Sequence, residues 1–134
     1  MNDILSDLFS FALQHNIEVE TTDELSPTTT AACNTETRRI VINTNYFDKR
    51  QLPLQTAHEI GHILNGDHSR TVLYFTPTKS KIEVSANVTA ISLLTPYYLR
   101  DRPDDYVSVN DFMDRFAIPE HLRYVVTEVL ESKI

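Results

Sequence analysis

Two histidines four residues apart enclose a glutamate in the segment AHEIGHIL, residues 57–64. Residues at this spacing lie on one face of a helix, about 6 Å apart along its axis, so His58 and His62 can bind one zinc ion together. Glu59 projects beside them, within reach of a water held on the metal, which is the position of a general base. Because zinc lowers the pKa of its bound water to about 7, these residues predict peptide hydrolysis at an HExxH-type metal centre.

A zinc site of this kind needs a third protein ligand. Without one, the segment would be a helix with two exposed histidines and an incidental glutamate. His68 is one candidate, because it completes the spacing HExxHxxNxxH, which is similar to the metzincin pattern HExxHxxGxxH. Two features argue against it: Gly66, rather than Asn65, is the expected turn residue, and Met113 lies in an expected amphipathic helix instead of a Met-turn.

Glu83 is the other candidate for the third ligand, 21 residues beyond His62 and near the start of the next expected helix. A carboxylate from a following helix would complete a His₂Glu set with an open position for water, the arrangement of thermolysin-like enzymes. The alternative for Glu83 is a solvated carboxylate that the helix macrodipole stabilises. Spacing alone leaves the choice of third ligand open.

The composition restricts both the class of protein and the class of metal site. The chain has 134 residues, 41% of them hydrophobic and spread along its length, which is typical of a globular domain. The single cysteine, Cys33, forms no internal disulfide and excludes a multi-cysteine zinc cage, so any metal is held by histidine and carboxylate. A net charge of -7 argues against direct nucleic-acid binding.

The sequence also indicates where the protein works. Its first residues lack the basic and apolar regions of a secretion signal, and no apolar run reaches the roughly 18 residues of a membrane span. We therefore expect a cytoplasmic protein without a membrane partner.

Hydrophobic periodicity and turn residues predict a small α+β domain. Helices are expected over about 3–15, 53–65 and 80–94. Pro96 should end the third of these helices. Strands are expected over about 16–20, 31–33 and 38–43, the last two joined by a polar turn into a short antiparallel sheet.

The end of the chain is expected to fold as a pair of helices. Ser108 and Asp111 have the spacing of a capping box, and Pro119 should open a last helix that runs to about residue 131. We interpret residues 1–134 as one domain with this pair as a C-terminal helical cap, over about 105–134.

Three segments in this order resemble the ImmA/IrrE family of metallopeptidases: IVIN at 40–43, AHEIGHIL at 57–64 and EVSANVTAISLLTP at 83–96. In that family a second helix, patterned roughly ExxANxFAxxLLMP, follows the motif helix, and Glu83 takes the position of its acidic ligand. Six further residues match that pattern: Ala86, Asn87, Ala90, Leu93, Leu94 and Pro96. Three residues depart from it and concern local packing rather than the ligands: Thr89, Ile91 and Thr95. The resemblance implies a zincin-like domain with zinc held by His58, His62 and Glu83.

Three more side chains are candidates for supporting roles. Asn87 lies one turn after Glu83 and would hydrogen-bond the ligand carboxylate or the second nitrogen of a histidine, or else pack as a polar residue between helices. Tyr74 and Tyr46 are candidate oxyanion donors, and an ordinary half-buried tyrosine is the alternative for each.

The residues and the resemblance together imply a zinc-dependent endopeptidase. Members of the resembled family encoded by phages and mobile elements act on helix-turn-helix repressors, so the resemblance implies a protein substrate of that kind. A second interpretation is an anti-repressor that works by binding alone, with zinc only joining two helices. A third is the toxin of a toxin–antitoxin pair. The C-terminal pair has the outline of a helix-turn-helix itself, but its acidic residues predict a packed or substrate-docking surface, not DNA binding.

Overall fold

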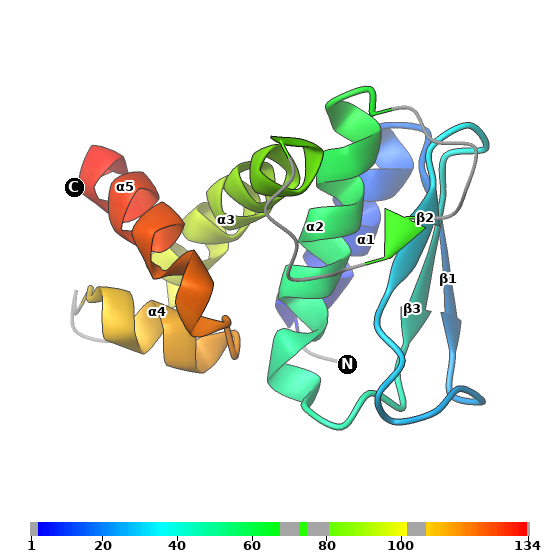
Figure 1. Ribbon diagram of the computed structural model, residues 1–134, viewed down its shortest axis with the longest axis horizontal. Helices are drawn as coiled ribbons and strands as arrows, with labels where there is room; N and C mark the ends of the chain where they lie inside the picture. The colour runs from blue at the N-terminus through cyan, green and yellow to red at the C-terminus, as the bar shows by residue number, and fades with distance from the viewer. Residues whose placement is uncertain (1–2, 68–72, 75–80, 102–106, 134) are drawn as a thin grey trace.

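The computed structural model describes residues 3–67, 73–74, 81–101 and 107–133 (Figure 1). The helices are α1 (Asp3–Gln14), α2 (Leu52–Leu64), α3 (Lys81–Asp101), α4 (Val109–Arg115) and α5 (Arg123–Lys133), with 3-10 turns η1 (Lys49–Gln51) and η2 (Glu120–Leu122). The strands are β1 (Glu18–Thr22), β2 (Ala32–Asn34), β3 (Arg39–Asn43) and β4 (Leu73–Tyr74). Figure 1 shows the sheet on one side of α2, and α3 with the C-terminal helices on the other. The predicted α+β class is confirmed, and α2 is its central helix.

The described strands form one mixed sheet in the order β1, β3, β2, β4. β2 and β3 pair antiparallel, with Cys33 opposite Ile40, as the polar turn between them predicts. β1 pairs parallel with β3, with Glu18 opposite Arg39, a pairing that the sequence pattern did not predict, so the sheet as a whole is mixed rather than antiparallel. The reason is that the chain passes from β1 through the loop 23–31 to β2 first, so that β3 returns between the two and runs alongside β1.

Helix α2 begins and ends within one residue of its predicted bounds. Asp48 caps the preceding turn η1 by accepting a hydrogen bond from the Arg50 amide at 3.1 Å, and Pro53 lies in the first turn, where its missing amide proton costs little. Gly66 follows the helix with a left-handed φ of 71°, as predicted. Every residue from Leu52 to Ile63 is buried, so the polar side chains of α2 must find their partners inside the protein.

Helix α3 runs seven residues beyond its predicted end, to Asp101, and Pro96 lies inside it. The prediction that Pro96 ends this helix is wrong. A proline costs a helix roughly 3 kcal/mol, and packing of the last turns offsets this loss. Tyr98 is fully buried, its hydroxyl donates to Asp111 Oδ2 at 2.6 Å, and its ring meets Phe112 edge-on with the ring centroids 5.0 Å apart.

The C-terminal helical pair is present as α4 and α5. The Ser108 hydroxyl caps α4 by accepting from the Asp111 amide at 2.9 Å, as its spacing predicts. Pro119 opens the turn η2, and α5 begins at Arg123, four residues later than expected. The buried apolar residues of this pair belong to the same core cluster as those of the sheet and α2. The interpretation of 1–134 as one domain, with a cap over about 105–134, stays a prediction.

Within the described ranges, no helix combines the length and the apolarity that crossing a membrane requires.

The contact between α2 and α3 leaves no room for a side chain at Gly61, which gives a first prediction. A Cβ at this position would lie 3.0 Å from the Ala86 carbonyl oxygen and 3.2 Å from Thr89 Cβ. Gly61→Ala should therefore destabilise the protein by about 1–2 kcal/mol, because the overpacking exceeds the gain of up to ~1 kcal/mol in helix propensity. Urea unfolding measures the change. A variant as stable as the unchanged chain would contradict this account of the helix contact.

Candidate metal centre

Three side chains that can bind a metal converge between α2 and α3. His58 and His62 project from α2, and Glu83 from the first turn of α3; each offers a ligand atom, and these atoms all lie within 4.8 Å of one another. His58 Nε2 lies 3.0 Å from Glu83 Oε2, and His62 Nε2 lies 3.0 Å from Glu83 Oε1. The two histidines are fully buried and Glu83 is 5% exposed. One carboxylate thus faces two imidazoles in an interior position.

The outer nitrogen of each imidazole is held by an oxygen acceptor. His58 Nδ1 donates to Asn87 Oδ1 at 2.7 Å, and His62 Nδ1 donates to Asp67 Oδ2 at 3.0 Å. Each pairing puts a proton on Nδ1 and turns Nε2 towards Glu83, which is the tautomer that a metal ligand requires. The structure therefore places Asn87 against a histidine, one of the two positions expected from the sequence.

Asp67 is a contact that the sequence pattern did not single out. It follows the left-handed Gly66, and its amide bonds back to the His62 carbonyl at 3.1 Å. This turn returns the chain towards the last turn of α2 and brings the carboxylate to His62. A carboxylate directly after an Asn-Gly helix end was the signal available in the sequence.

Several buried polar atoms at the centre have no hydrogen-bond partner among the described residues. They are both carboxylate oxygens of Glu59 and Nε2 of His62, which is close to Glu83 but not in hydrogen-bonding geometry with it. Buried polar groups without partners are rare in proteins, and they commonly indicate a ligand, an ion or a water. The donor set of two imidazoles and one carboxylate fits zinc, and it is one protein ligand short of the four that close a structural zinc site.

Burial and mutual contact shift the pKa values of these groups. Burial raises the pKa of Glu83, but contacts with His58 and His62 outweigh it and lower the value to about 2. Burial lowers the pKa of His62, but Glu83 and Asp67 outweigh it and raise the value to about 9. Burial raises the pKa of Glu59 to about 8, against the opposing effects of Cys33 and His62. A divalent cation at the centre would act in the same direction as His62 and lower the pKa of Glu59.

The remaining candidates from the sequence do not join this cluster in the described part of the chain. His68 and the side chain of Tyr74 lie outside the described residues, so their roles as alternative ligand and oxyanion donor stay predictions. The Tyr46 side chain is 8% exposed and packs against the Phe47 ring at a centroid distance of 4.8 Å.

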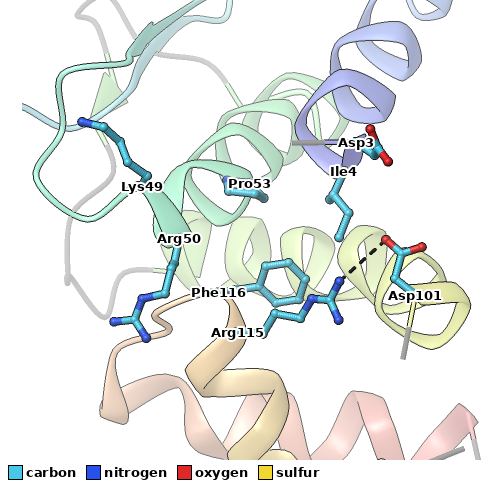
Figure 2. A pocket seen from close by; sticks show the side chains of 8 residues that line it. All are labelled: Asp3, Ile4, Lys49, Arg50, Pro53, Asp101, Arg115 and Phe116. Atoms are coloured by element: carbon cyan, nitrogen blue, oxygen red, sulfur yellow. Dashed lines mark ion pairs between the residues drawn. The ribbon is translucent and has the colours of Figure 1, made fainter. Parts of the chain in front are cut away.

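A pocket of about 420 Å³ lies at the other end of α2 (Figure 2). Its lining contains none of the metal-binding side chains and comes from α1, η1, α2, α3 and α4. The charged groups there are largely paired, with Arg50 on Asp48 at 2.9 Å and Arg115 facing Asp101 at 3.7 Å. The chemistry of the molecule is therefore concentrated at the metal centre rather than in this pocket.

Comparison with known proteins supports this interpretation of the site. The model of the peptidase M78 family, described as the IrrE N-terminal-like domain, matches residues 12–121. No curated protein and no solved structure is matched. The matched region contains every residue of the metal centre.

The geometry predicts which variants lose the metal. His58→Ala, His62→Ala and Glu83→Ala should each lose most of about one bound zinc per chain, because two remaining protein ligands bind zinc poorly. His68→Ala and the exposed control His121→Ala should retain it. Elemental analysis of the purified proteins measures the zinc content. Loss of zinc in His68→Ala with retention in Glu83→Ala would identify the metzincin-like set instead.

A further prediction concerns the acceptor that orients His58. Asn87→Ala leaves all three ligands in place but removes the oxygen that holds His58 Nδ1, so zinc affinity should fall by roughly 10–100-fold. Asn65→Ala is the matched control, because Asn65 also links α2 to α3, through Ser85 and Thr89, without touching a ligand. Competition with a zinc-binding dye measures both affinities. Equal losses in the two variants would mean that Asn87 acts only in helix packing.

Proposed function

Because the chain belongs to the peptidase M78 family of IrrE N-terminal-like domains, we propose that its metal centre is the active site of a zinc-dependent endopeptidase of the HExxH type. The observation that supports this most directly is the state of Glu59. Its carboxylate is fully buried beside the ligand His58, and neither oxygen has a hydrogen-bond partner among the described residues. Burying a carboxylate without hydrogen bonds costs free energy. Such carboxylates are typical of functional sites, where the group transfers a proton.

The roles of the side chains follow from their positions. His58, His62 and Glu83 would hold zinc, which when bound supplies a Lewis acid and lowers the pKa of water. Glu59 takes a proton from the water that attacks the scissile carbonyl and later returns it to the leaving amine. Asn87 and Asp67 keep the two imidazoles in the tautomer that presents Nε2 to the metal.

The donor set also favours catalysis over a purely structural metal. Structural zinc is usually closed by four protein ligands, whereas catalytic zinc has three and an open position. The described residues offer three donors, and the buried Glu59 carboxylate has no hydrogen-bond partner among them. A non-proteolytic anti-repressor, in which zinc only joins α2 to α3, is therefore the second hypothesis.

We propose a protein substrate of the kind implied by the resemblance to the ImmA/IrrE family, a helix-turn-helix repressor of a phage or mobile element. A repressor bound to DNA would place this reaction in the cytoplasm. The excess of acidic residues, 19 against 12 basic ones, favours contact with a protein rather than with its DNA.

Glu59→Gln separates the enzyme from the binder. Glutamine has nearly the same shape but accepts no proton, so hydrolysis should fall by roughly 10²–10⁴-fold while zinc content and circular dichroism stay unchanged. Fragments of the repressor on a gel and relief of repression in cells are the measurements, with the exposed Glu128→Gln as control. Full relief of repression by Glu59→Gln, without fragments in either protein, would reject the peptidase and support binding alone.

A further inference from the structure

The one cysteine of the chain lies beneath the metal centre. Cys33 is 1% exposed and lies on β2, the strand that packs against α2. Its strand neighbours Ala32 and Asn34 are only partly buried, because alternate residues of a strand face opposite sides of the sheet. The thiol therefore points into the layer that contains α2.

The alignment of α2 on β2 brings Glu59 to this thiol. One turn before Glu59, on the same face of α2, Gln55 Oε1 accepts a hydrogen bond from the Ala31 amide at 2.8 Å. Four residues along a helix advance about 6 Å, and two residues along a strand advance about 6.6 Å. Glu59 lies one such step beyond Gln55 along α2, and Cys33 on β2 lies one such step beyond Ala31. Because the two steps are nearly equal, Glu59 and Cys33 lie at the same level of the contact between helix and strand.

The electrostatics of the two groups agree with this contact. The pKa of the Cys33 thiol is raised well above its usual value, first by burial and then by the charge and hydrogen bonding of Glu59. The thiol therefore keeps its proton, and its S–H group can donate. The contact is looser than a full hydrogen bond, since neither Glu59 oxygen meets the required geometry. No nitrogen or oxygen donor among the described residues replaces it.

We propose that Cys33 is a positioning residue, whose S–H group holds the Glu59 carboxylate in the orientation from which it accepts the proton of the attacking water. The inference rests on the proposed peptidase function. A thiol is suited to this role because it is a weak donor. It restricts the rotation of the carboxylate through a contact weaker than that of a hydroxyl or an amide.

Kinetics with a repressor or peptide substrate test the role in catalysis. Cys33→Ala should lower kcat about ten-fold with KM nearly unchanged, because a misplaced catalytic group slows the reaction without weakening substrate binding. Cys33→Ser should recover part of the loss, since its hydroxyl can donate to Glu59 from the same position but binds the carboxylate more strongly than the thiol does. Ile40→Val removes one methyl group opposite Cys33 in the same buried layer and should keep kcat despite any loss of stability. An unchanged kcat in Cys33→Ala, or a loss in Ile40→Val as large as in Cys33→Ala, would overturn the proposal.

The S–H stretching band provides a readout that is independent of activity. The chain has one cysteine, so its infrared spectrum contains one such band. In the zinc-loaded protein, where Glu59 is ionised, Glu59→Gln should shift this band to higher frequency, because an amide oxygen is a weaker acceptor than a carboxylate. Glu128→Gln, far from the thiol in sequence and exposed on α5, should leave the band unchanged. An unshifted band in Glu59→Gln would contradict the contact.

These two tests separate the inference from the function on which it rests. A wild-type protein that cleaves no substrate would reject the peptidase and with it the role of Cys33 in catalysis. The infrared band would still decide whether Cys33 holds Glu59. A wild-type protein that cleaves, together with an active Cys33→Ala variant, would reject only the role of Cys33.

Discussion

The close approach of α2 to α3 is the constraint on which the metal centre depends. A Cβ at position 61 would lie 3.0 Å from the Ala86 carbonyl oxygen, so the two helices are almost in backbone contact there. His62 follows Gly61 directly, and Glu83 lies three residues before Ala86 on the other helix. The separation of the helices therefore sets the separation of imidazole and carboxylate. A donor set divided between two helices keeps its spacings of 3.0 Å only while that contact is preserved.

The parts of the site that the sequence could predict are those with a local signal. The spacing of His58 and His62 has meaning only on a helix, and Pro53 and Gly66 mark the two ends of that helix. The third ligand was harder to predict, because spacing alone did not distinguish Glu83 from His68. The resemblance of the segment 83–96 to a family pattern favoured Glu83, and the structure brings it to both histidines.

Features that depend on distant contacts were beyond the sequence pattern. Nothing in the alternation of β1 shows that it pairs parallel with β3, because the choice of partner is made by the connection through β2. Pro96 is a strong local signal for a helix end, yet the buried Tyr98 and its bond to Asp111 continue α3 past it. The burial of Cys33 against α2 likewise exists only once β2 packs on that helix.

The buried charges of the candidate metal centre can balance in two different ways, and this would link metal binding to the proposed catalysis. With protons alone, the lowered pKa of Glu83 and the raised pKa values of His62 and Glu59 favour one negative, one positive and one neutral group among these three. With a divalent cation, a neutral His62 and two ionised carboxylates again sum to zero. Replacing the protons by a divalent cation therefore leaves the buried net charge at zero. A net charge in a low-dielectric interior would cost much free energy. A cation at the centre would also remove the proton from Glu59 and leave this carboxylate in the ionised form that its proposed role as general base requires.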